Sequence, residues 1–467
     1  MFSRWQNNNA ICDAVGNLSQ LSAKHKKLLI SDDKDEISKA HKIWRDMAEC
    51  YWEILFAILD AKFEKMPANI NFDEEERLFI DVGYLNGVLD INKDFDADKF
   101  LNSKAHGGIF PVMTFSDYIS YQWSLIMGAE PLKSPIGDDL EGRIKTLTED
   151  LEKVQTDRDN MLLKISESYT NQFNLRQGIS ALDKNLMSML KYLMRVPEYR
   201  EGSESFRQQI ANERKYYNDA ESAVMILISS AQTASENPLP SFEVERFKNI
   251  HELTKVLGRK ILYAQIDKRK IKRNADKIKE DCRSLTPGMK RGVLREMLTK
   301  KREYMAVPAK NARCDQTLLC QPDDMPIDYA KNSAVLEKLS ADDIEMFNGP
   351  RVRMYGIPTV IFIPGQGLGT YDWLDNSLLI PVFPLGGEEK SLAYALGTFR
   401  WDSDEDLKLR TPYGQIKEYR RLSTIAMAQT FYRDYSIYMT REKAGYRVLA
   451  SNVHKVFDQI LKYRPEE

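Results

Sequence analysis

The feature that most constrains how this chain folds is a seven-residue repeat of apolar side chains, kept over more than fifty residues. Two sets of positions, each spaced by seven residues or a multiple of seven, fall on one helix face. A heptad pattern of this length is typical of a coiled coil, in which long helices pack along an apolar seam. The first set is Ile144, Leu151, Ile165, Ile179, Leu186 and Leu193, and the second is Leu140, Leu147, Val154, Met161, Leu175, Leu182 and Met189.

A second heptad seam lies further along, between residues 242 and 281. Pro197 and the Pro-rich segment 236–241 interrupt the chain between the two seams. Two heptad helices in one chain predict an arm at 138–306 that folds back on itself as a long antiparallel coiled coil. Pairing between chains, which makes an oligomer, is the alternative that the sequence leaves open. In either case we expect the seam to carry assembly through Ile144, Leu151, Ile165, Ile179 and Leu186.

The segments on either side of the arm have globular patterns. Residues 1–130 contain an amphipathic helix pattern at 34–65, which Pro67 ends, and predict a helical domain. Residues 327–467 contain strand-like runs at 351–363 and 378–383, then helical patterns at 388–401, 416–438 and 447–461. The expected fold is therefore mainly α, with a helical N-terminal domain, a long antiparallel coiled-coil arm and a small α+β C-terminal domain.

A glycine-rich loop follows the first strand-like run, with glycines at 365, 367 and 369. No Gly-Lys-Ser/Thr follows these glycines, so the loop is not a P-loop. The next element is a strand rather than a helix, which also excludes the dinucleotide-binding fingerprint. We therefore expect a tight hairpin turn in which glycine supplies positive φ.

The order of elements from Arg351 to Asp402 resembles the front half of a zincin metalloprotease domain, in which an edge strand precedes the active-site helix. In that family the HExxH motif supplies two zinc ligands on one helix face and a general base. Here the helix reads LAYALGTF, which places Tyr394, Ala395 and Thr398 at the three chemical positions. Gly397 matches the glycine common before the second histidine. The resemblance thus implies a degenerate, zincin-like pseudoenzyme without HExxH, and we expect no catalytic residue, no metal and no cofactor.

A basic stretch from Arg259 to Arg313 carries 18 Lys or Arg against six Asp or Glu. Such a face neutralises phosphates in nucleic-acid-binding proteins, and anionic lipid or a protein surface is another partner of that chemistry. Charge pairing with the acidic heptads near residues 138–159 is the alternative explanation. The residues that we assign to nucleic-acid contact are Lys268, Arg269, Lys270, Lys272 and Arg273.

Charge and cysteine content indicate the setting of the protein. The net charge is -2, so the whole chain has no bias toward nucleic acid or membranes. Five cysteines, an odd and sparse count, are typical of a reducing compartment rather than a disulfide framework. No stretch offers about 18 consecutive apolar residues, which excludes a transmembrane helix. We expect a cytoplasmic location.

The leading functional hypothesis is a non-catalytic interaction or scaffold protein. The arm would mediate self-association or contact with a protein partner, and the C-terminal domain would bind a partner through Tyr and Arg side chains, which are favoured at interfaces. One alternative is a nucleic-acid-associated factor that binds through residues 259–313, and another is a hydrolase with an unrecognised site. The residues that we assign to partner contact in the C-terminal domain are Arg400, Trp401, Tyr419, Arg420 and Arg421.

Overall fold

The computed structural model describes residues 5–29, 33–83, 110–132, 140–167, 272–305, 329–343, 350–384, 387–404 and 409–461, together with 246, 249–250, 253–254, 257–258, 261 and 346. Contacts between residues divide the chain into two units. Unit 1 comprises Met1–Asp138, Lys272–Gly349 and Ile357–Glu467, and unit 2 comprises Asp139–Ile271 and Pro350–Gly356.

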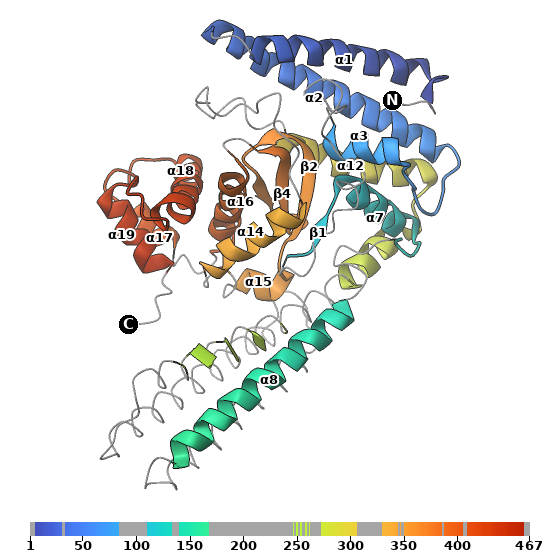
Figure 1. Cartoon of the computed structure of the whole chain (residues 1–467). Helices are drawn as coiled ribbons and strands as arrows, with labels where there is room; N and C mark the ends of the chain where they lie inside the picture. Colours follow the sequence, from blue (N-terminus) through green and yellow to red (C-terminus); the bar gives the residue numbers. More distant parts are fainter. Residues whose placement is uncertain are drawn as a thin grey trace. The chain divides into compact units, whose positions relative to one another are not determined.

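The described part of the chain is mainly helical, as expected, and contains one small mixed sheet (Figure 1). Unit 2 holds α8 (Leu140–Glu167) and α15 (Pro350–Tyr355). None of the helices in the described ranges is long and apolar enough to cross a membrane. The elements of unit 1 are α1 (Asn9–Leu29), α2 (Lys34–Phe63), α3 (Glu74–Val82), β1 (Val112–Met113), α7 (Phe115–Met127), α12 (Pro287–Met305), α14 (Tyr329–Ala341), β2 (Thr359–Gly367), β3 (Thr370–Asp372), β4 (Ser377–Pro384), α16 (Glu388–Asp402), α17 (Arg410–Gly414), α18 (Thr424–Ile437), a π-helix (Tyr438–Glu442) and α19 (Ser451–Ile460).

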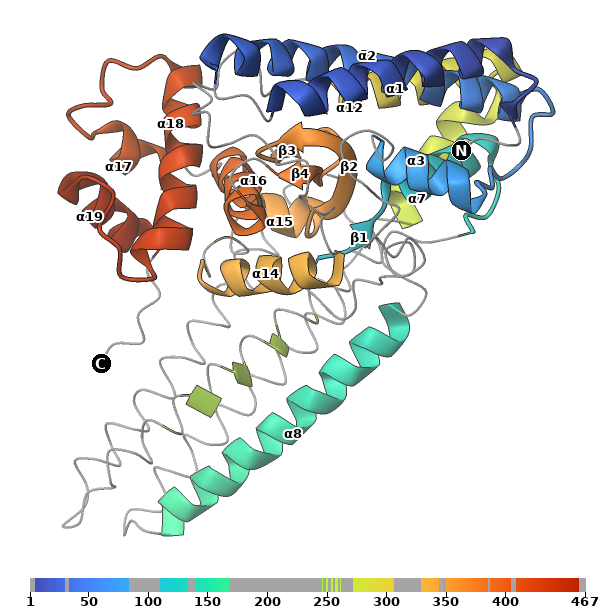
Figure 2. The same ribbon diagram turned by 45° about the horizontal axis from the view of Figure 1, so that its top comes forward.

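Among the N-terminal helices, α2 follows closely from the sequence. α2 occupies nearly the whole stretch predicted at 34–65, and it lies along α1 in both views (Figure 2). Asp33 accepts a hydrogen bond from the backbone N–H of Asp35 at the start of α2. The apolar stripe of the helix is buried, as at Met47, Tyr51 and Ile54, which are fully inaccessible. Burial of this stripe stabilises the helix within unit 1.

The sheet joins segments that the sequence analysis assigned to separate domains. The strand order is β1-β2-β4-β3, with β1, β2 and β4 parallel and β3 antiparallel at one edge. At the other edge, Val112 of β1 pairs with Val360 of β2. The ranges 1–130 and 327–467 therefore share one sheet in unit 1. α12, which lies within the predicted arm, also belongs to unit 1, because it packs on β2 and α7.

Helices cover the sheet from several sides (Figure 1). α16 packs on β3 and β4, whereas α3, α7 and α12 pack on β2. α14 and α18 in turn pack on α16. The central strands β2 and β4 each contain a long apolar run, as expected for strands that are buried on both faces. Val360, Phe362, Leu378 and Ile380 are 0% exposed.

Three of the predicted boundaries are wrong. Residues 350–355 form α15 rather than a strand, because Pro350 suits a helix start and Gly356, with φ 71°, ends it. The helix predicted at 416–438 begins only at Thr424, since Ser423 caps it through the N–H of Ala426. The helix predicted at 447–461 begins at Ser451. The predictions at 378–383 and 388–401 correspond to β4 and α16.

The glycine-rich loop is not the hairpin turn that we predicted. β2 and β3, which flank it, are not neighbours in the sheet, because β4 lies between them. Gly369 has φ +73°, and a Cβ placed on it would lie 3.0 Å from the Cβ of Ala395 and 3.2 Å from the carbonyl oxygen of Ser391. A side chain at this position would meet α16, because the backbone of residue 369 passes directly beside that helix, so glycine is needed.

In unit 2, the heptad residues of α8 lie in a buried apolar cluster. Leu151 packs with Leu257 and Ile261, and Leu147 and Val154 are half-buried beside them. Two segments that are about a hundred residues apart therefore meet within one chain. Among the other predicted seam residues, Ile144 is half-buried on α8 and Ile165 lies on α8. Ile179 and Leu186 lie outside the described residues.

Candidate functional site

α16 contains the positions at which the zincin resemblance requires metal ligands. Tyr394 is half-buried, with its ring 5.7 Å from that of Tyr432. Ala395 is fully buried, and the hydroxyl of Thr398 donates to its carbonyl oxygen at 2.7 Å. None of these side chains suits a divalent metal in this setting. Across the described ranges, no group of three or more His, Cys, Asp and Glu could hold a metal ion.

Gly397 and Arg400 of α16 bind this helix to its neighbours. A Cβ on Gly397 would lie 3.0 Å from Cδ1 of Tyr435, so the glycine lets α18 approach closely. The hydroxyl of Tyr435 donates to Oδ2 of Asp343 at 2.9 Å, and Nε of Arg400 donates to the same oxygen at 3.2 Å. Burial, followed by the charge of Asp343, raises the pKa of Tyr435 well above its usual value. The hydroxyl therefore acts as a hydrogen-bond donor at physiological pH.

The residues predicted for partner contact fall into two groups. Arg400 and Trp401 are buried, at 8% and 5% exposed, and Trp401 packs on Phe431 with ring centroids 4.9 Å apart. These two side chains pack inside the protein rather than on its surface, because α16 is enclosed between the sheet and α18. Tyr419 is half-buried and donates to Asp434 at 2.6 Å. The other two residues, Arg420 and Arg421, are exposed.

A group of buried charges in unit 1 surrounds Lys301 of α12. Its ammonium nitrogen lies 2.7 Å from Oδ2 of Asp372, 2.5 Å from Oδ2 of Asp375 and 3.1 Å from Oγ of Ser377. The side chain of Lys301 is 2% exposed and that of Asp372 is 3% exposed, whereas that of Asp375 is 29% exposed. From α7, the hydroxyl of Tyr118 donates to Asp375 at 3.2 Å. The cluster thus connects α12 and α7 to the β3–β4 connection.

This geometry does not activate a nucleophile. All three donors of the Lys301 ammonium are used, by two carboxylates and one hydroxyl, so the amine has no lone pair to offer as a base. Ser377 is 1% exposed and donates its proton to Asp375. Burial, followed by the charge of Asp375, raises the pKa of Tyr118 well above its usual value, so this phenol remains a donor. The contacts favour a structural role for the cluster.

The cluster fixes the turn between β3 and β4. Asp372 accepts a hydrogen bond from the backbone N–H of Leu374 at 3.0 Å, which forms an Asx turn. Asn376 adopts φ 53°, a left-handed conformation that asparagine tolerates, and its side chain accepts from the hydroxyl of Tyr371 at 2.7 Å. Between these anchors, Trp373 and Leu374 are 58% and 57% exposed. A rigid turn therefore presents two large apolar side chains to solvent.

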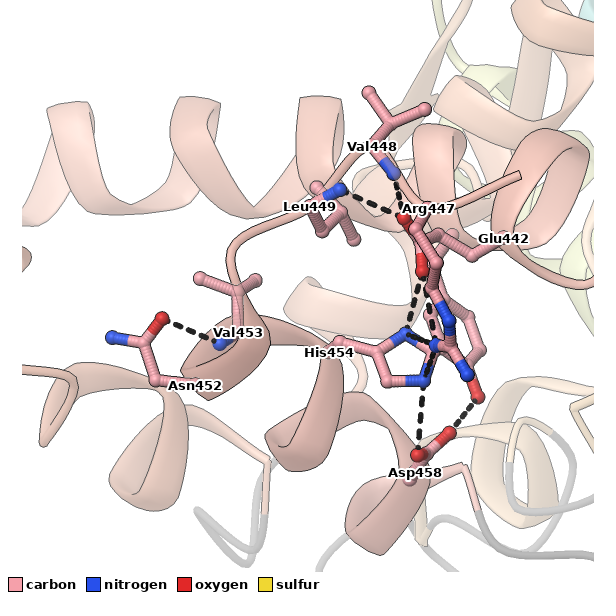
Figure 3. Close-up of polar contacts among 9 residues, drawn as sticks. Glu442, Arg447, Val448, Leu449, Asn452, Val453, His454 and Asp458 are labelled. Carbon is pink, nitrogen blue, oxygen red and sulfur yellow. Dashed lines mark hydrogen bonds and ion pairs between the residues drawn. The ribbon is translucent and has the colours of Figure 1, made fainter. Parts of the chain in front are cut away.

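A second polar cluster orders the loop before α19 (Figure 3). The buried side chain of Glu442 accepts hydrogen bonds from the backbone N–H groups of Val448 and Leu449, the latter at 2.7 Å. Nδ1 of His454 lies 2.7 Å from Glu442, and Nε2 lies 3.1 Å from Asp458. Burial acts to raise the pKa of Glu442, but the two backbone donors and the neighbouring side chains of His454 and Arg447 lower it overall. Glu442 is thus held as an anion that organises the loop.

The basic stretch is only partly described. Lys272 and Arg273 are exposed on a helical segment of unit 1. Lys268, Arg269 and Lys270 lie outside the described residues. Further along the same stretch, Lys301 is buried. The basic composition of residues 259–313 therefore does not form a single exposed face, because at least one of its cations is neutralised inside the protein.

Two features were not predicted from the sequence. One is the Lys301 cluster, formed by Lys301, Asp372, Asp375 and Ser377, and the other is the exposed Trp-Leu turn, formed by Trp373 and Leu374. In the sequence, Lys301 is one cation of the basic stretch 259–313, and Asp372 and Asp375 have no spacing that points to a site. A usable signal was present in Tyr371–Ser377, where Asp, Asn and Ser surround a Trp-Leu pair, because these residue types favour a turn. The partner lysine lies about seventy residues away and carries no local signal.

Comparison of the chain with protein-family models, with curated proteins and with solved structures gave no match.

Proposed function

We propose that the protein is a non-catalytic interaction protein whose globular part presents the Trp-Leu turn to a protein partner. One observation carries this proposal, namely that Trp373 and Leu374 are exposed side by side on a turn fixed by buried ion pairs. Trp is among the residues that dominate binding energy at interfaces. A contact residue that is already held in place also loses less conformational entropy on binding. Contact through Tyr419, Arg420 and Arg421 is a second surface of the same kind, because Leu422 and Ile425 are exposed beside it.

The test is quantitative affinity capture with the intact chain and a double variant, Trp373→Ala with Leu374→Ala. The matched control is Met289→Ala, which removes a side chain that is 56% exposed on α12 of the same unit. We expect the double variant to lose a defined set of bound proteins that the wild type and the control both retain. An unchanged set of bound proteins would refute the assignment of this turn as the partner site.

We further propose that the predicted arm is an antiparallel coiled coil within one chain. The packing of Leu151 with Leu257 and Ile261 supports a chain that returns along α8. The mass in solution, measured by light scattering, tests this for the intact protein and for a version without residues 140–271. This deletion ends before Lys272 because α12 belongs to unit 1. We expect both proteins to be monomers, and an intact dimer that the deletion converts to a monomer would contradict pairing within the chain.

The degenerate zincin-like character of residues 351–402 remains a proposal. The antiparallel edge strand β3, followed by β4 and then α16, supports it, because the resemblance rests on this order of elements. Tyr394, Ala395 and Thr398 lack ligand groups for zinc in this position, which supports loss of the metal. Metal analysis of the purified protein tests this point. We expect no stoichiometric zinc, whereas zinc bound at one equivalent together with peptidase activity would overturn the proposal.

A second candidate function is nucleic-acid binding, which the exposure of Lys272 and Arg273 favours. Binding that depends on phosphate neutralisation weakens steeply with salt. We would titrate duplex DNA and RNA at increasing salt with the wild type and with Lys272→Gln/Arg273→Gln. This function requires salt-sensitive binding that the double variant weakens. Binding to neither polymer at low salt would exclude it.

A further inference from the structure

A cleft of about 170 Å³ lies within the segment 69–132 of unit 1, away from the Trp-Leu turn in sequence. Its walls come from the loop between α2 and α3, from α3 and from the N-terminal half of α7. α3 and α7 pack against each other (Figure 1). This volume lies below the range of about 300–1,000 Å³ of sites for drug-sized ligands, so the cleft suits a small metabolite.

The loop that forms one wall is fixed before any ligand binds. Nε1 of Trp123 donates to the carbonyl oxygen of Pro67 at 2.9 Å, which anchors the start of the loop to α7. Nζ of Lys62 donates to the carbonyl oxygen of Asn71 at 2.7 Å, which anchors its middle to α2. The end of the loop is the capping box at Asp73. A site built on such a wall does not have to order itself on binding.

Two polar groups of the cleft, one acceptor and one cation, are available to form hydrogen bonds with a ligand. Oδ1 of Asn69 is buried and accepts no hydrogen bond within the described part of the protein. Unsatisfied buried acceptors are uncommon in native proteins and call for an explanation, such as a bound ligand or water. Arg77 lines the same cleft; its charge acts on the buried Asp81, but no hydrogen bond or ion pair joins its guanidinium to another described residue. The cleft therefore offers an acceptor for an N–H group and a cation for an anionic group.

The other charges around the cleft limit the ligand further. The carboxylate of Asp117 also lines it, so the lining carries one positive and one negative formal charge. Behind the wall, Ser116 donates from its backbone N–H and its hydroxyl to the buried Asp81. Burial raises the pKa of Asp81 to about 7, so Asp117 supplies most of the negative charge near the cleft at neutral pH. A lining in which this carboxylate accompanies a single arginine disfavours a dianion such as phosphate. It favours a ligand that is neutral overall but carries both charges.

We propose that this cleft binds a small apolar α-amino acid in its zwitterionic form. The carboxylate of the ligand pairs with the guanidinium of Arg77, a fork that suits a planar anion. The ammonium group donates to Oδ1 of Asn69 and is favoured by the charge of Asp117. The apolar side chain packs on Ile70, Phe72 and Leu132, three apolar residues of the lining.

The test is calorimetric titration of the full-length protein with L-leucine, L-methionine and L-valine. N-acetyl-L-leucine and L-leucine methyl ester are the comparison ligands, because each lacks one of the two charges, and inorganic phosphate tests for a general anion site. The variants are Arg77→Gln and Asn69→Ala. The matched control is Arg283→Gln, since the side chain of Arg283 is 80% exposed and does not line the cleft.

We expect saturable binding of at least one free amino acid and little binding of the two blocked forms. Arg77→Gln should weaken this binding about tenfold or more, whereas Arg283→Gln should leave it unchanged. If Arg77→Gln melts at a much lower temperature than the wild type, the Asn69→Ala variant is used in its place to test the loss of binding. The Trp373→Ala/Leu374→Ala variant should bind the amino acid normally, which separates this inference from the proposed interaction function.

Three results overturn the inference. The first is the absence of binding by all three amino acids up to about 10 mM. The second is equal binding of the methyl ester, which lacks the carboxylate assigned to Arg77. The third is phosphate that competes with leucine, which would make the cleft an anion site.

Discussion

Replacing the buried Asp81 by Asn tests how the ionisation of this carboxyl is linked to folding. The side chain is 0% exposed, and it accepts the backbone N–H of Ser116 at 2.7 Å and its hydroxyl at 2.9 Å. Desolvation raises the pKa of Asp81 from 3.8 to about 7, although both hydrogen bonds from Ser116 act to lower it. Asn has nearly the same shape, and its carbonyl oxygen can accept the same backbone N–H. The substitution therefore removes the ionisation and keeps the packing.

The sign and size of the effect follow from linkage. Between pH 3.8 and about 7 the folded protein holds a proton at Asp81 that the unfolded chain has released. The contribution of Asp81 to the free energy of unfolding is therefore intact below pH 3.8 and is lost progressively as the pH rises to about 7. At about 1.4 kcal/mol per pH unit, this interval corresponds to a loss of about 4 kcal/mol, which the Asn variant does not suffer.

The assay is urea unfolding at about pH 4 and about pH 8, followed by tryptophan fluorescence, since Trp52 and Trp123 are buried in the same core. We expect the free energy of unfolding of Asp81→Asn, relative to the wild type, to rise by about 4 kcal/mol from the lower to the higher pH. The matched control is Asp46→Asn, which changes an exposed carboxylate on α2. A difference between Asp81→Asn and the wild type that stays constant across this pH range would falsify the reasoning.

Two further substitutions test the packing of unit 1. Lys301→Met leaves two aspartates without their cation, and we expect a loss of about 3–5 kcal/mol of unfolding free energy in urea; Lys300→Met, at a surface ion pair, should cost at most about 1 kcal/mol. Equal losses for Lys301→Met and Lys300→Met would show that burial of the cluster contributes nothing to the unfolding free energy. Gly397→Ala places a Cβ 3.0 Å from Tyr435 and should lower the unfolding free energy by about 1–3 kcal/mol. The matched control is Gly292→Ala, whose Cβ would have no atom within 4 Å and should stabilise its helix by about 0.5–1 kcal/mol. Both effects are measured by thermal unfolding.

Several elements could be predicted because their signals are local. The apolar spacing of residues 34–65 predicts α2, and the paired glutamates after the glycines at 386–387 mark the start of α16. The apolar run at 378–383 predicts β4, which is buried between helices. Each of these features depends on residues within one or two turns of helix or one length of strand.

The candidate sites depended on contacts that no local pattern reports. Lys301 and its two aspartates are separated by more than seventy residues, so only the packing of α12 on the sheet brings them together. The same holds for the cleft, in which Asn69 and Arg77 meet residues of α7. The sequence identified these residues as polar and charged, but it did not identify which of them are buried.

By itself, the sequence determined the helical character, the heptad seams and the absence of HExxH at the expected helix. Tertiary structure alone decided that Val112 would pair with Val360, that Lys301 would lie inside, and that Trp373 and Leu374 would lie outside. The physical reason is that helix periodicity and turn preference arise from neighbours along the chain. Strand pairing and the burial of a charge instead depend on partners that only the folded chain brings within bonding distance.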